Sequence, residues 1–203
     1  MTALGRLLVL IALAALARPA LAERVVLVVA GVSIERPSTW IQVSGPQTLA
    51  GAARSGYGSA ELRERMQQAL AAGPFVAFGK ATGRHANVAP MVRLHVRPRL
   101  DLGGRTLTDM LRRSYDQLAR SIPDVRYVEE PAANARFGPG GAVMKIAYTL
   151  GTGASAVTVR SQNWVVERGD RLISVSITMA EDEAAAIWPE ADAILDTIRF
   201  DEP

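Results

Sequence analysis

The sequence predicts an α+β fold in which a single antiparallel β-sheet has helices packed on it. Three observations point to this class. The strand-like runs are rich in Val, Ile and Thr, and Gly- or Pro-containing turns separate them. The later turns are short, which requires antiparallel pairing, because parallel neighbours need a long crossover connection. The helical segments are interleaved with the strands without regular βαβ alternation.

The first 22 residues have the pattern of a cleavable export signal. Arg6 precedes a short apolar run at 7–16, and the small-residue motif Ala20-Leu21-Ala22 follows it. We therefore expect cleavage between Ala22 and Glu23. Arg18 interrupts the apolar run too early for a bilayer-spanning helix, so no stable membrane anchor is expected after cleavage.

The remaining residues, 23–203, are expected to form one domain. The sequence contains no Cys, so no lipid can be attached at the cleavage site and no disulfide can form. An exported domain without disulfides suits a bacterial periplasm, and we expect a periplasmic or secreted protein. Removal of the leader takes away two Arg and leaves 21 basic against 20 acidic residues, so net charge gives no argument for nucleic acid.

The domain is predicted to begin with one or two strands in 25–36 and a further strand at 39–44. Pro37-Ser38 between them is a turn signal, and the second run is expected to return alongside the first. Residues 45–58 are rich in Gly, Ala and Ser and are expected to form a loop.

A helix and a β-hairpin are predicted next. Ser59 is placed to cap a helix that ends at Gly73-Pro74. The strand-like runs 75–82 and 89–100 follow. The loop between them contains His85, and we expect it to join them as an antiparallel hairpin.

The second helix is predicted from about Thr106 to Ile122, because Gly103-Gly104 precedes it and Pro123 stops it. Its Leu residues line one side at helical spacing, and its Arg residues lie on the other. A short strand at 125–130 follows.

The chain is predicted to end with three strands in a meander and a last helix. The strands at 142–150, 156–167 and 171–180 are separated by short Gly-containing turns. The helix begins at about Glu181. Its apolar side includes Trp188, which is therefore expected in the core.

Three segments together resemble the PsbP-like fold family. They are SIERPSTWIQV near the start, a meander with Gln162 and GDRLISVSITM, and a last helix that finishes ADAILDTIRF. The resemblance covers most of residues 30–200 and implies an α/β/α sandwich. It also implies an accessory or binding role, because members of this family generally act by binding other proteins. The residues that carry it are turn and core positions, namely Pro37, Trp40, Gly169, Ile194 and Phe200.

The sequence shows no catalytic motif. It has no Cys and no Gly-x-Ser-x-Gly nucleophile elbow. His85 and His95 are the only histidines, and a Ser-His-acid triad through either depends on geometry that the sequence does not define. We therefore expect a protein that is not an enzyme.

No metal or cofactor is expected either. The two His residues are ten positions apart, one in a loop and one on a strand, which matches no metal-ligand spacing. The acidic run at 181–183 complements the dipole of the helix that starts there. Residues 138–141 are rich in Gly, but no Lys-Ser or Lys-Thr follows and a strand comes next, unlike a phosphate-binding loop.

The segment MVRLHVRPR, residues 91–99, alternates apolar and basic residues. Because side chains alternate along an extended strand, the apolar positions should be buried and the basic ones should share the other face. The apolar positions are Val92, Leu94 and Val96. The basic positions, which are the candidate partner- or ligand-binding residues, are Arg93, His95, Arg97 and Arg99.

This basic row belongs to a chain with an uneven distribution of charge. Residues 84–126 contain nine Arg and four Asp, whereas 181–203 contain one Arg and eight acidic residues. We expect the row to meet an acidic protein partner, an anionic ligand, or the acidic C-terminal helix of the same chain. The remaining interpretation is a solvated strand face without a partner.

The sequence thus predicts an exported, non-enzymatic accessory protein that acts by protein–protein interaction. Nucleic acid is not an expected partner, because the chain is exported and its Arg residues are not interleaved with aromatic ones. The alternative is a carrier of a small anionic or envelope-derived ligand, held between the sheet and a helix near Arg93 and Arg97. An uncharacterised hydrolase is the third possibility.

Overall fold

The computed structural model describes most of the chain after the predicted leader. The described residues are 22–54, 64, 67–68, 70–81, 84–85, 88–99, 101–122 and 124–201. Residues 1–21 of the predicted leader and most of the helix predicted from Ser59 lie outside them. In the part of the chain that is described, no helix is long and apolar enough to cross a lipid bilayer.

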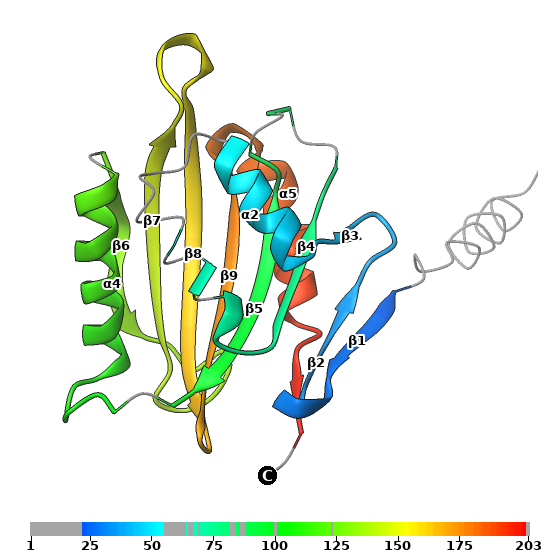
Figure 1. Cartoon of the computed structure of the whole chain (residues 1–203), viewed down its shortest axis with the longest axis vertical. Helices are drawn as coiled ribbons and strands as arrows, with labels where there is room; N and C mark the ends of the chain where they lie inside the picture. Colours follow the sequence, from blue (N-terminus) through cyan, green and yellow to red (C-terminus); the bar gives the residue numbers. More distant parts are fainter. Residues whose placement is uncertain are drawn as a thin grey trace, which may run out of the picture.

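Seven strands form one antiparallel sheet, in the order β3-β4-β5-β9-β8-β7-β6 (Figure 1). The strands are β3 (Ile41–Gln42), β4 (Phe75–Gly79), β5 (Met91–Pro98), β6 (Arg126–Ala133), β7 (Ala142–Leu150), β8 (Val157–Arg168) and β9 (Arg171–Ala180). Strands β7, β8 and β9 are the predicted meander. Gly169, with a φ of 57°, forms the tight turn between the last two.

Three further strands form a second sheet, so the predicted single sheet is two sheets in the structure. They are β1 (Glu23–Leu27), β2 (Val32–Arg36) and β10 (Arg199–Phe200), in the order β1-β2-β10. The run 25–36, expected to form one strand or two, is divided by a short 3-10 helix, η1 (Val28–Ala30), and by Gly31 at a φ of 58°. This break folds β2 back onto β1, and β3 therefore pairs with β4 rather than with its predicted partner.

The loop predicted at 45–58 is also incorrect in part, because helix α2 (Gly45–Arg54) occupies most of it. Ser44 and Gln47 form a capping box at its start. The Gln47 side chain accepts a hydrogen bond from the Ser44 amide at 2.8 Å, and the Ser44 hydroxyl accepts one from the Gln47 amide at 3.3 Å. This reciprocal pair satisfies amides that the first turn leaves free, which outweighs the low helix propensity of the Gly residues.

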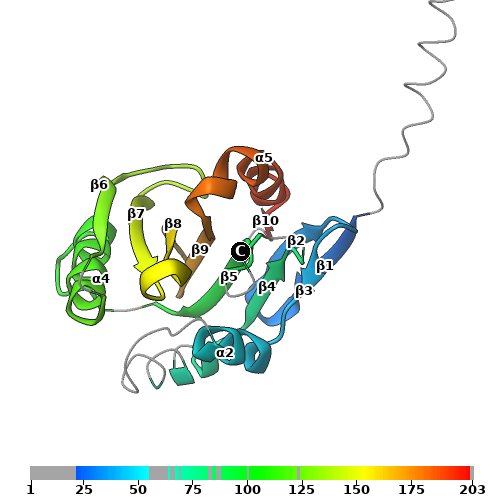
Figure 2. The same ribbon diagram turned by 90° about the horizontal axis from the view of Figure 1, so that it is seen from above.

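The helices cover both faces of the large sheet (Figure 2). Helix α4 (Leu107–Ser121) packs on β6 and β7, and α2 lies on the same face near β4. Helix α5 (Ala184–Leu195), preceded by the 3-10 turn η3 (Glu181–Glu183), lies on the opposite face and contacts β5, β9 and β2. The predicted start of α4 is confirmed, since Thr106 and Asp109 form a capping box there.

The core has two parts, one on each side of the large sheet. The first lies between the sheet and α5, and the second between the sheet and α4. On β5, Val92, Leu94 and Val96 are at most 2% exposed and belong to the first part, as their alternation predicts. Their basic neighbours therefore face the opposite layer, the one that contains α4.

Candidate functional site

The basic row lies on the central region of the sheet rather than at an edge. β5 is flanked by β4 and β9, so each side chain of the row has a neighbour on both sides. His95 lies opposite Ser174 of β9 and Phe75 of β4. The edge of one ring points at the face of the other in the Phe75–His95 pair, with centroids 6.2 Å apart. Arg93 lies opposite Ser176 of β9.

A cavity of about 370 Å³, open to solvent on one side, lies over this face of the sheet and is bordered by the strands, by α4 and by Leu70. Three members of the row, Arg93, His95 and Arg97, line it, and all three are half-buried. The cavity is therefore cationic along β5. Helix α4 forms its other wall with Met110, Ser114 and Leu118, which lie one helical turn apart and share one side of the helix.

Hydroxyl and amide groups follow the basic row across the sheet. Ser174 and Ser176 of β9 line the cavity, and Ser161 and Asn163 of β8 continue this polar strip. The Asn163 amide donates to the Ser161 hydroxyl at 3.2 Å, and that hydroxyl lies 3.1 Å from the Thr178 hydroxyl. These groups act as neutral donors and acceptors beside the cations.

Two polar atoms of the row are buried without a hydrogen-bond partner. They are Nε2 of His95 and Nε of Arg97. Arg93 donates its Nε to the sulfur of Met91 at 2.8 Å, which is a weak acceptor. Among the described residues, no carboxylate lines the cavity or forms an ion pair with the row members inside it.

This environment changes the ionisation of His95 and Arg97. Burial, followed by the positive charge of Arg97, lowers the pKa of the His95 imidazole below its ordinary value. Burial also lowers the pKa of Arg97. Both shifts indicate that positive charge at this site is poorly solvated and poorly neutralised by the protein itself.

Arg99 is not part of this cavity. It lies after the end of β5, its side chain is 59% exposed, and it forms an ion pair with Glu167 at 3.1 Å. Its backbone amide donates to Asp170 at 2.7 Å. The structure thus brings together three of the four candidate residues and leaves the fourth at the surface.

The acidic C-terminal helix is excluded as the partner of the row, because α5 lies on the other face of the sheet (Figure 2). Its carboxylates, and those of η3, have other partners. Glu190 pairs with Lys80 at 2.6 Å, and Asp182 lies 3.0 Å from His85. This interpretation of the basic row, one of those left open by the sequence, is therefore wrong.

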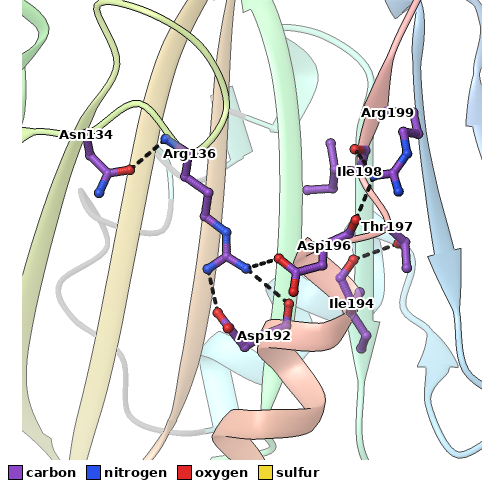
Figure 3. Close-up of polar contacts among 8 residues, drawn as sticks. All are labelled: Asn134, Arg136, Asp192, Ile194, Asp196, Thr197, Ile198 and Arg199. Atoms are coloured by element: carbon purple, nitrogen blue, oxygen red, sulfur yellow. Dashed lines mark hydrogen bonds and ion pairs between the residues drawn. The ribbon is translucent and has the colours of Figure 1, made fainter.

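Arg136, in the connection between β6 and β7, forms ion pairs with two acidic residues at the end of α5 and so links these two parts of the chain (Figure 3). Its guanidinium donates to Asp192 and to Asp196, both at 2.5 Å. It also lies 5.4 Å from the centre of the buried Trp164 ring. Burial by itself would lower the pKa of Arg136, but the two carboxylates outweigh it and raise the pKa.

Trp188 differs from its prediction as a core residue. It is only half-buried, packs against the edge of the core under α5, and borders an open groove beside Val128 and Lys145. The fully buried tryptophan of this layer is Trp40, whose indole donates to Glu190 at 3.2 Å. Helical spacing placed Trp188 on the correct side of the helix but did not define how deep it lies.

Neither histidine forms a complete catalytic or metal-binding group within the described part of the chain. His95 has serines nearby but no carboxylate in the cavity lining, and His85 has Asp182. In these same residues, no three His, Asp or Glu side chains come close enough to hold a metal ion together.

Sequence reasoning missed the serines of β9 and the cavity-facing side of α4. A signal for the serines was present, since Ser174, Ser176 and Thr178 alternate with Ile173, Val175 and Ile177 just as the basic row alternates on β5. When polar residues occupy every second position on two adjacent strands, and on the same face, they indicate a polar surface on that face of the sheet.

These layers define the chain as an α+β sandwich with a PsbP-like fold, which confirms the predicted fold class. A solved structure with this fold is cyanobacterial PsbP (CyanoP) from Synechocystis sp. PCC 6803, with 15% sequence identity, coverage of 91% of this chain and 95% of that chain, and a TM-score of 0.53. At this identity the likeness concerns the fold alone.

Two further structures are similar over most of their length. LpqN of Mycobacterium tuberculosis, which is involved in cell envelope biogenesis, has 10% identity, 90% and 91% coverage of the two chains, and a TM-score of 0.49. The Ran-binding protein Mog1p of Saccharomyces cerevisiae has 11% identity, 89% and 95% coverage, and a TM-score of 0.48. No protein-family model matches the sequence, and a comparison with curated proteins finds no match.

Proposed function

We propose that this chain is an exported binding protein that takes up a small anion in the cavity over β5. The observation that carries the proposal is the buried, unpartnered nitrogen of Arg97 beside that of His95, in a cavity whose described lining contains no carboxylate. An unsatisfied buried donor is costly, and more so when it is charged. An oxyanion in the cavity would supply both the missing acceptors and the missing negative charge.

The cavity favours a small ligand over the protein partner that the sequence predicted. Protein interfaces are extensive, whereas the three cavity-lining members of the row are half-buried on the face of the sheet. A volume of about 370 Å³ falls within the range of ligand pockets, roughly 300–1,000 Å³. Only Arg99 is at the surface, and Glu167 already neutralises it.

Binding rather than catalysis is proposed for a chemical reason. His95 is the only histidine among the described lining residues, and no described carboxylate is there to orient it or to share its proton. The periplasm or the exterior remains the proposed location, because the leader pattern and the absence of Cys support export. N-terminal sequencing of protein from a periplasmic extract should begin at Glu23, and retention of Met1 in the membrane fraction would contradict export.

The test of binding uses isothermal titration calorimetry with inorganic phosphate, acetate, hexanoate and decanoate as probes. We expect saturable binding of at least one of them by the wild-type protein, weakened by added salt. The double variant Arg93→Gln/Arg97→Gln should lose it, whereas the control Arg99→Gln should retain it. Equal binding by the double variant, or no binding of any probe by the wild type, would overturn the proposal.

A further inference from the structure

The cavity has a charged end and an apolar end. Across the sheet from β5 to β7, its lining changes from Arg93 and Arg97 to the hydroxyl groups of β9 and β8, and then to Met144 and Ile146 of β7. The strand order β5-β9-β8-β7 separates the two ends by three strand spacings, or about 14 Å at roughly 4.8 Å each. A compact inorganic anion would fill only one end.

The apolar end is formed by the outer side of α4 and the core beneath it. Met144 and Ile146 lie on the sheet and are at most 4% exposed, and Met110 and Leu118 of α4, which are half-buried, pack against this core and border the cavity. Leu111, one position from Met110 on the same helix, is 3% exposed and also lines the cavity. Two of these side chains are methionines, which are flexible and adapt to the shape of an apolar guest.

From this polarity we infer that the ligand is an amphipathic anion, with its oxyanion head between Arg93, His95 and Arg97 and a single apolar chain along Met110 and Leu118 of α4. The inference rests on the proposed function, because it concerns the ligand of the same cavity. Guanidinium groups suit both carboxylate and phosphate monoester heads, and these share the chemistry that the charged end requires.

The volume indicates the size of the guest that would fill the cavity, which is open on one side. If each non-hydrogen atom takes about the 30 Å³ that a water molecule takes in the liquid, a cavity of about 370 Å³ holds roughly a dozen such atoms. Decanoate, with ten carbons and two oxygens, is of this size. Shorter chains leave part of the apolar end empty, and longer chains must extend out of the cavity.

The experiment is a chain-length series of acetate, hexanoate, octanoate, decanoate and tetradecanoate, each below its critical micelle concentration, measured by calorimetry on the purified protein. Decyl phosphate is added to compare a phosphate head with a carboxylate head on the same chain. Decanol is added as a ligand of the same chain length without a charge. We expect affinity to rise about threefold to fourfold with each methylene up to about ten carbons and then to level off. Decanol should bind at least tenfold more weakly than decanoate.

Variants at Leu118 test the apolar end separately from the charged end. Leu118→Gln should flatten the dependence of affinity on chain length and reduce decanoate affinity more than acetate affinity. Ile187→Gln is the matched control, because Ile187 is also a half-buried apolar residue of a helix but belongs to α5 on the other face of the sheet. If Leu118→Gln does not fold, Leu118→Trp, which fills the apolar end, should still bind acetate and reject decanoate.

The outcomes separate this inference from the proposed function. Anion binding that depends on Arg93 and Arg97 but not on chain length would overturn the amphipathic ligand and leave the anion site intact. Affinity for decanol equal to that for decanoate would overturn the anionic head. Absence of binding for every anion, long or short, would overturn the proposed function itself.

Discussion

Replacement of Arg97 by Met should make the ligand-free protein more stable, although it removes a residue of the proposed site. Met keeps a long flexible stem that can cover the same apolar surface. It carries no charge and no donor, so the buried Nε that lacks a partner disappears with the guanidinium. A residue retained for stability would give the opposite result, so the variant separates a binding role from a structural one.

The magnitude follows from the surroundings of Arg97. A buried donor without a partner costs about 1–3 kcal/mol, and burial of a charge adds to this. The side chain is only half-buried, so we take the lower end and expect a gain of about 1 kcal/mol in the free energy of unfolding. For a chain of this size, that corresponds to a rise in Tm of about 2–4 °C.

The assay is urea and thermal unfolding of wild type, Arg97→Met and the control Arg99→Met, with and without decanoate. Arg99 is exposed and paired with Glu167, so its variant should be close to neutral. Decanoate should raise the Tm of wild type and of Arg99→Met but not that of Arg97→Met. A ligand-free Arg97→Met protein that is less stable than wild type by more than about 1 kcal/mol would refute the reasoning, because it would show that Arg97 supports the fold.

Three further predictions concern the packing and charge of the fold. Arg136→Met should lower the free energy of unfolding by about 1–3 kcal/mol, since it removes a partly buried guanidinium that pairs with Asp192 of α5 and with Asp196 at its end. Chemical denaturation measures this, and an effect no larger than that of the surface variant Arg112→Met would contradict it. Gly73→Ala should lower the free energy of unfolding by about 1–3 kcal/mol, because a Cβ there would lie 2.0 Å from a backbone oxygen of β5. Gly45→Ala is the control, since a Cβ at Gly45 meets no atom within 4 Å. Equal urea midpoints for the two variants would contradict the prediction. Acidification should destabilise the protein through His95. Its folded pKa lies below the ordinary value of 6.5, so its contribution is present above pH 6.5 and is lost as the pH falls from there through the folded pKa. His95→Gln should therefore lose less stability than wild type between about pH 7.5 and pH 5, and parallel pH profiles of the two proteins would show that His95 does not carry this effect.

The arrangement of β5 could be predicted because strand alternation is a local property. Val92, Leu94 and Val96 are buried whatever covers them, since three apolar side chains on one face of a strand need a core. The helix that starts at Thr106 was predictable for a similar reason, because its capping box involves residues three positions apart. The same local signal was present at Ser44 and Gln47, although the Gly-rich composition around it suggested a loop.

The second sheet was not predictable from local pattern. Strand β10 pairs with β2 across most of the length of the chain, joining Phe200 to Val32. A hydrophobic run predicts that a segment will be a strand, but the partner of that strand depends on which strand edges the other elements leave unpaired. The break at Gly31, which separates β1 from β2, lies within a run that reads as continuously apolar.

The members of the site were partly predictable, and their environment was not. Alternation placed Arg93, His95 and Arg97 on one face, but the cavity beside them depends on where α4 and the segment before β4 lie over the sheet. Arg99 follows the same alternation in the sequence and is excluded only because the strand ends before it.

The sequence by itself determined the fold class, the alternation of the strands, the position of the basic row and the expectation of export, because each depends on residue type and short spacing. Only the tertiary structure decided what the row faces. The carboxylates of α5 are paired with Lys80 and Arg136, which lie 110 and 56 residues away in the chain, on the far side of the sheet. The basic residues of β5 are left with a cavity instead. Contacts over such separations depend on how whole layers pack, and no local pattern encodes them.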